Sequence, residues 1–205
     1  MGNKTAKHFG FFFASLIPTF LVILLILLSV IGVVSAGGSS NSTTGKRTRL
    51  TAQEVAQKAN ISVERAEDVI KILNWQLSKE KFTLEGASGS LANAERESGF
   101  DPKLTNPSGG VAGYFQWSGW DNTINGDRWR NASSRTLDST VELELMSYEL
   151  NHGYKKVKDY MQKATDPFES AKYWSEHYEG VSLSDGQTKL GKLEKDSKKW
   201  YEVFK

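Results

Sequence analysis

The sequence contains no cysteine, and it has only three histidines and four prolines among its 205 residues. The missing thiols exclude disulfide bonds, thiolate metal sites and a cysteine nucleophile, and so few histidines argue against a zinc site. The hydrophobic content of 39% and the charged content of 24% are typical of a globular protein. We therefore expect a folded chain whose chemistry uses carboxylates, hydroxyls and tyrosines, with no metal and no cofactor.

Acidic residues are absent from the first 50 positions, which hold five basic residues. After residue 50, the chain has 21 basic and 24 acidic residues. This part lacks the basic excess that nucleic-acid-binding domains present to phosphate groups. We expect no nucleic-acid partner.

Residues 9–35 carry no charge and are long enough to cross a hydrocarbon core of about 30 Å as a helix. We predict one transmembrane anchor in the cell membrane, with secretion after cleavage at Ala36 as the alternative, because small residues end there. The lysines in residues 1–8 favour a cytoplasmic head and a single-pass protein whose C-terminal domain lies outside. The membrane is therefore one expected partner.

Residues 36–50 are rich in Gly, Ser and Thr and predict a flexible linker in front of a domain at 51–205. In this domain, capping residues and apolar periodicity predict six helices. They run from Thr51 to about Lys58, from Ser62 through Leu77, from Thr83 to Gly99, from about Val141 to Gly153, from Asp166 to about Tyr178, and from about Gly186 to Val203.

Residues 101–135 differ from the rest of the domain, because they contain two prolines, five glycines and three tryptophans with little periodicity. Long structured loops are usually functional. We therefore predict a mainly α fold, in which a helical domain surrounds an irregular Gly- and Trp-rich active-site loop. A small sheet within this loop is left open.

Glu95 and Glu97 lie in the last turn of the helix that is expected to end at Gly99. The negative end of the helix macrodipole disfavours a carboxylate there, which favours the protonated form that a general acid needs. Both glutamates flank the apolar face of the helix, so helical phase does not choose between them. A solvated glutamate at a helix end is the alternative for either residue.

Four segments carry the most distinctive motifs of the domain: Ala92–Pro102, Gly113–Trp117, Leu145–Leu150 and Ala171–Glu179. In this order they resemble the phage tail lysozyme family. The resemblance implies a lysozyme-like α+β fold that cleaves the β-1,4 bond between N-acetylmuramic acid and N-acetylglucosamine in peptidoglycan. It also implies that Glu97, in the family's Glu-Ser motif, is the general acid. The residues directly after Gly113–Trp117, and those directly after Tyr178-Glu179, depart from the family pattern. The resemblance therefore does not determine the details of the cleft wall.

The loop and the end of the preceding helix supply the expected substrate-binding residues. Aromatic rings suit the C–H faces of sugars, and an amide can hydrogen-bond an acetamido group. These residues are Ser98, Tyr114, Gln116, Trp117 and Trp120. The alternatives are that Trp117 packs in the core and that Gln116 only ties the loop to a neighbouring strand.

The second catalytic group is left open among Asp101, Asp121 and Asp127. Closure on the muramic 6-hydroxyl, as in lytic transglycosylases, would need no second acid. We expect a peptidoglycan hydrolase that opens the wall locally for a conjugation, export or phage-related machine, with channel proteins as further candidate partners. The alternative from another class is a non-catalytic module that binds glycan or docks on a secretion channel.

Overall fold

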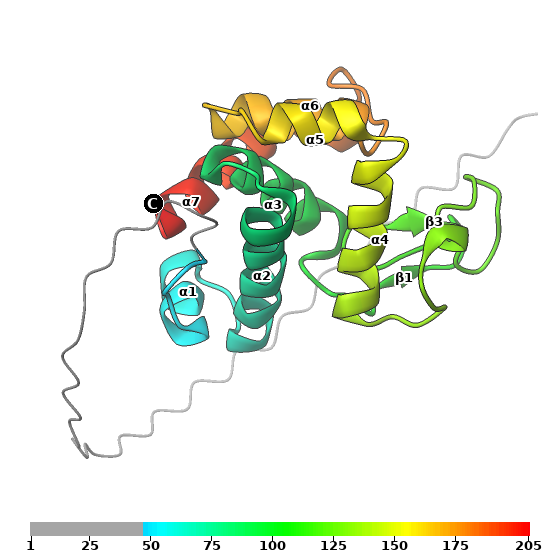
Figure 1. Cartoon of the computed structure of the whole chain (residues 1–205), viewed down its shortest axis with the longest axis horizontal. Coiled ribbons are helices and arrows are strands. Elements are labelled where there is room, and N and C mark those ends of the chain that lie inside the picture. Colours follow the sequence, from blue (N-terminus) through cyan, green and yellow to red (C-terminus); the bar gives the residue numbers. More distant parts are fainter. Residues whose placement is uncertain (1–46) are drawn as a thin grey trace, which may run out of the picture. The chain divides into compact units, whose positions relative to one another are not determined.

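Helices make up 58% of the part of the chain that the computed structural model describes, residues 47–205 (Figure 1). A mainly helical domain is what the sequence predicts. The α-helices are α1 (Ala52–Ala59), α2 (Val63–Trp75), α3 (Leu84–Ser98), α4 (Ser139–Asn151), α5 (Lys155–Met161), α6 (Pro167–His177) and α7 (Leu190–Phe204). Shorter helical turns are η1 (Gln76–Glu80), η2 (Trp129–Asn131) and η3 (Gly186–Thr188).

Side-chain caps start four helices where the sequence predicts them. Thr51 and Glu54 form a complete capping box at α1. Ser62, Thr83 and Asp166 each accept a hydrogen bond from the backbone N–H three residues further on, at the starts of α2, α3 and α6. These bonds satisfy donors that a helix N-terminus otherwise leaves free.

The last helix differs from its prediction. It begins at Leu190 and not near Gly186, because Gly186–Thr188 forms a separate 3-10 turn. Lys189, between the two elements, adopts a left-handed backbone conformation with φ of 47°. This residue interrupts the helical geometry, so the two segments do not join.

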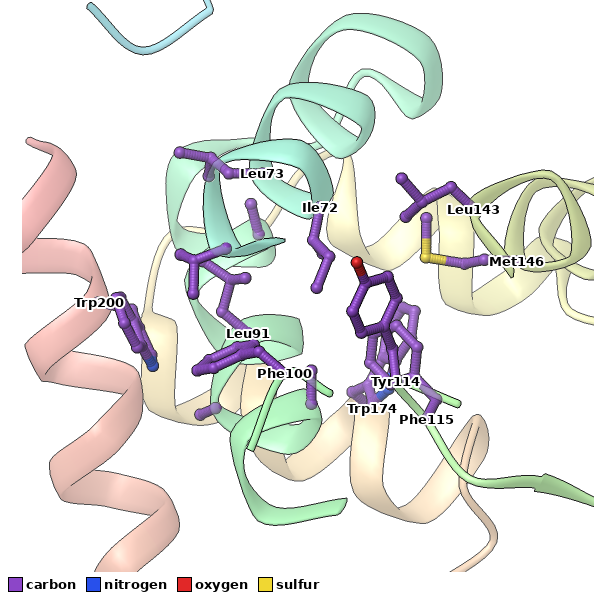
Figure 2. Packing of buried hydrophobic residues seen from close by; sticks show 14 of the residues in the cluster. Ile72, Leu73, Leu91, Phe100, Tyr114, Phe115, Leu143, Met146, Trp174 and Trp200 are labelled. Carbon is purple, nitrogen blue, oxygen red and sulfur yellow. The ribbon is translucent and has the colours of Figure 1, made fainter. Parts of the chain in front are cut away.

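Helix α3 packs against α2, α5, α6 and α7. Two of its glycines permit close backbone approach: a Cβ atom on Gly89 would lie 2.5 Å from the backbone nitrogen of Ala171, and one on Gly86 would lie 2.3 Å from the carbonyl oxygen of Met161. Buried side chains fill the surrounding core, among them Ile72, Leu91, Phe100, Trp174 and Trp200 (Figure 2).

The loop at 101–135 contains a small antiparallel sheet of order β1-β2-β3, formed by Thr105–Asn106, Val111–Ala112 and Trp117–Ser118. The loop docks on α4 through Glu142, which is fully buried and whose Oε2 atom accepts a hydrogen bond from the backbone N–H of Tyr114 at 2.8 Å. Burial raises the pKa of Glu142 to about 9, so this carboxyl group is neutral at physiological pH.

The structure corrects the predictions of a transmembrane helix and of a single-pass membrane protein. No helix between residues 47 and 205 is long and apolar enough to cross a membrane. Helices α3 and α7 have 15 residues each, which is about 22 Å and short of a hydrocarbon core of about 30 Å. The segment 9–35, on which these predictions rest, and the cleavage alternative at Ala36 lie outside the described residues.

Candidate active site

Glu97 lies in the last turn of α3, which Gly99 ends in a left-handed conformation with φ of 59°. The Glu97 side chain is 23% exposed. It lines a cavity of about 270 Å³ together with Arg96, Val181 and Lys189. A partly buried carboxyl group at the wall of a cavity can exchange a proton with a molecule bound there.

Arg96 holds one oxygen of Glu97. Its Nε and Nη2 atoms donate to Glu97 Oε1 at 3.0 and 2.7 Å, and its Nη1 atom donates to Ser175 Oγ in α6 at 3.0 Å. Both of these bonds from Arg96 to Glu97 end on Oε1. Arg96 thus fixes the carboxyl group through one oxygen and leaves the other available.

A second carboxyl group, Glu179, follows α6 and interacts electrostatically with Glu97. Its side chain is 6% exposed, and Trp174 Nε1 donates to its Oε1 atom at 2.9 Å. Burial, and then the charge of Glu97, raise the pKa of Glu179 to about 8, although Arg128 Nη1, 3.9 Å from Oε2, acts in the opposite direction. The Glu179 carboxyl group therefore holds its proton at neutral pH.

A hydrogen-bond network around Arg128 joins the loop at 101–135 to α4 and to the end of α6. Arg128 Nε and Nη2 donate to the two carboxylate oxygens of Glu149 in α4 at 2.8 and 2.7 Å. Trp117 Nε1 and the Tyr178 hydroxyl both donate to Glu149 Oε2, at 3.0 and 2.7 Å. The Arg128 guanidinium also lies over the Tyr178 ring at 4.6 Å. One carboxylate therefore joins the loop to α4 and to the end of α6.

Glu95 points to a different neighbour. Both of its carboxylate oxygens accept from Lys199 Nζ at 2.7 Å, and Oε2 also accepts from Trp200 Nε1 at 2.7 Å. Lys199 and Trp200 belong to α7. The structure thus gives Glu95 a role in joining α3 to α7, on another side of the helix from the cavity.

Tyr114, Trp117 and Ser98 contribute to the packing of the loop. Tyr114 and Trp117 are fully buried, and the Tyr114 hydroxyl donates to Asp68 Oδ1 at 2.8 Å. Ser98 Oγ donates to the Tyr114 carbonyl oxygen at 2.9 Å and is partly buried. The sugar contacts expected of Tyr114 and Trp117 are therefore corrected, since neither ring presents a face to solvent. The domain uses these rings to fill its core.

Gln116 and Trp120 are partly exposed. Gln116 Nε2 donates to the carbonyl oxygens of Leu104 and Gly113, each at 3.0 Å, and so ties two parts of the loop together. The Trp120 ring packs against Trp129 and lies 5.5 Å from the guanidinium of Arg135. A sugar contact of either residue stays a prediction.

The three aspartates considered as second catalytic groups do not line the cavity beside Glu97. Asp101 pairs with Arg65 Nη2 at 2.8 Å. Asp127 Oδ1 accepts from the backbone N–H of Arg130 at 3.2 Å, and Asp121 is exposed.

The sequence analysis assigns no role to Glu179. Its position directly after an aromatic-rich helix end is the signal that could have indicated a buried carboxyl group.

No group of three or more His, Asp or Glu side chains within residues 47–205 could hold a metal ion. In the comparison with protein families, the model described as phage tail lysozyme matches residues 64–204. This range contains Glu97, Glu179 and all four residues that line the cavity beside Glu97. No curated protein and no solved structure matches the chain.

Proposed function

Since the chain belongs to the phage tail lysozyme family, and so has a domain of lysozyme-like peptidoglycan hydrolases, we propose that it cleaves the β-1,4 bond between N-acetylmuramic acid and N-acetylglucosamine. We propose Glu97 as the general acid. The observation that carries this proposal is the carboxyl group of Glu97 at the wall of a cavity, held by Arg96 through one oxygen alone.

In the proposed mechanism, Glu97 Oε2 carries the proton and donates it to the glycosidic oxygen as the sugar develops oxocarbenium-like character. Arg96 orients the carboxyl group through Oε1, and Ser175 in turn orients Arg96. Lys189 lines the same cavity and supplies positive charge for polar groups of the glycan. The C–O bond breaks as the O–H bond forms on the leaving sugar.

We assign to Glu179 the role of a positioning residue that is neutral beside Glu97 at neutral pH. Burial, and then the charge of Glu97, raise the pKa of Glu179 to about 8. Its Oε1 atom accepts from Trp174 Nε1 at 2.9 Å, and Arg128 Nη1 lies 3.9 Å from its Oε2 atom. Glu179 thereby links α6 to Arg128 of the loop.

Glu179→Gln is expected to reduce the loss of stability that the wild type shows as the pH rises from about 5 to 8. Burial, and then the charge of Glu97, raise the pKa of Glu179 in the folded protein to about 8 from its ordinary value of 4.5, so over this range the unfolded chain ionises at Glu179 while the folded chain resists ionisation. A glutamine at this position carries no charge in either state, so the variant should lack this contribution. Urea unfolding of both proteins at pH 5 and pH 8 measures the difference. An equal loss of stability in the two proteins would contradict a buried, neutral Glu179.

A lytic transglycosylase reaction is the second candidate, and one observation favours it. Among the described residues that line this cavity, Glu97 has the sole carboxyl group, and the others are Arg96, Val181 and Lys189. Hydrolysis with an activated water uses a second carboxylate near the substrate. Attack by the muramic 6-hydroxyl on its own anomeric carbon forms a 1,6-anhydro product and needs no such group in the cavity.

Release of soluble muropeptides from purified cell walls tests whether the chain is an enzyme. We expect the full chain to lower the turbidity of a wall suspension and to release muropeptides in proportion to its concentration. Binding to walls that sediment intact, with no release, would instead support a non-catalytic glycan-binding module. We also propose that the cut serves local wall opening by a conjugation, export or phage-related machine, since the matching family is that of phage tail lysozymes.

A further inference from the structure

A second, larger cavity of about 570 Å³ lies between α1, the α2–η1 segment, the start of α3 and the end of α7. Its volume falls in the range of about 300–1,000 Å³ typical of small-molecule sites. Most of its inner lining is apolar, with Leu73, Leu77, Phe82, Leu84, Val203 and Phe204. Buried or partly buried apolar side chains around an open space offer a favourable place for a hydrocarbon chain.

In the described part of the chain, no acidic residue lines the cavity. Five cationic residues of this part surround the apolar lining: Arg47, Arg49, Lys58, Lys81 and Lys205. All five are exposed. Within residues 47–205, Lys205 pairs with Glu202 at 2.8 Å, and Glu54 lies close enough to Lys58 for its pKa to respond. Arg47 and Arg49 form no ion pair with any described residue. The rim therefore has an excess of positive charge that a bound anion would neutralise.

The cavity is separate from the candidate active site. Leu84 is the first residue of α3, whereas Glu97 lies in its last turn. Thirteen residues of α-helix place these positions about 20 Å apart along the axis. A ligand here would not occupy the space beside Glu97.

We propose that this cavity binds a single-chain anionic amphiphile, a long-chain fatty acid, with its alkyl chain along the apolar lining and its carboxylate at the Arg47 and Arg49 side of the rim. A methylene group takes roughly the volume of a water molecule, about 30 Å³, so the space suits one chain of about 16 carbons and not two. A polyanion without a chain would leave the apolar lining exposed, and a neutral chain would leave the arginines without a partner. The proposal is independent of the hydrolase activity.

Photolabelling with a palmitate analogue that carries a diazirine in its chain tests the proposal on the full-length protein. We expect label on lining residues such as Leu77, Phe82 and Val203, and its loss in the presence of excess palmitate. The variant with Arg47→Gln and Arg49→Gln together should need at least about tenfold more analogue for half-maximal labelling, because charge-assisted contacts are lost. Lys195→Gln, an exposed lysine of α7 away from the cavity, is the matched control and should label as the wild type does.

Four results would overturn the proposal. Label that falls outside the lining residues, including label confined to residues 9–35, would place the ligand elsewhere. Competition by hexadecanol as strong as that by palmitate, or normal labelling of the double variant, would show that charge is not recognised. Competition by inorganic phosphate alone would indicate a simple anion site and not a site for an amphiphile.

Discussion

Glu97→Gln is expected to lower the rate of peptidoglycan cleavage by about 10²- to 10⁴-fold, because an amide cannot donate the proton that the leaving oxygen requires. The substitution keeps the size of the side chain and an oxygen that can accept from Arg96. The fold should therefore persist, and substrate affinity should change little. Rates with a muropeptide oligomer, together with circular dichroism, measure both effects.

Glu95→Gln is the matched control, since it changes the same group two positions away on the same helix. Glu95 bonds to Lys199 and Trp200 of α7 and does not line the cavity beside Glu97. We expect the variant to keep most of its activity and to lose about 1 kcal/mol of stability from the weakened ion pair. An active Glu97→Gln beside a folded, inactive Glu95→Gln would transfer the role of general acid to Glu95.

Gly89→Ala is expected to lower the free energy of unfolding by about 1–3 kcal/mol or more, because the new Cβ atom would meet backbone atoms that cannot rotate away. It would lie 2.5 Å from the nitrogen of Ala171. Helix α6 would have to move from α3, and α6 holds Ser175 and precedes Glu179. Activity should therefore fall with stability. Urea unfolding and the muropeptide assay measure the two effects.

Gly191→Ala provides a control of opposite sign. Gly191 lies in the first turn of α7, and a Cβ atom there would meet nothing within 4 Å. Replacing a helical glycine by alanine at an open position stabilises by up to about 1 kcal/mol. Equal stability of the two alanine variants would contradict the close approach of α3 and α6.

The helix starts could be predicted because their signals are local. Thr51, Ser62, Thr83 and Asp166 cap helices through bonds to residues three positions away, so a short stretch of sequence contains the whole interaction. Gly99 likewise ends α3 by itself. The prediction of a transmembrane helix, in contrast, rested on residues outside the described part and found no support among the described helices.

The candidate site could be predicted only in part because its contacts are long-range. Glu97 stands at a helix end that the sequence indicates, but its relation to Glu179 depends on how α6 packs on α3. For Trp117, the sequence allowed either a sugar contact or packing in the core. Only the fold shows that its indole N–H donates to Glu149 and Tyr178 in the interior. Composition identifies an aromatic loop, but it cannot tell which rings face inward.

Mass spectrometry of the muropeptides that the wild-type chain releases from purified peptidoglycan tests the central claim most directly. We expect fragments that end in N-acetylmuramic acid, as the reducing sugar after hydrolysis or as the 1,6-anhydro form after transglycosylation, and we expect Glu97→Gln to release neither. Fragments that end in reducing N-acetylglucosamine, or products cut only in the peptide stems, would contradict it.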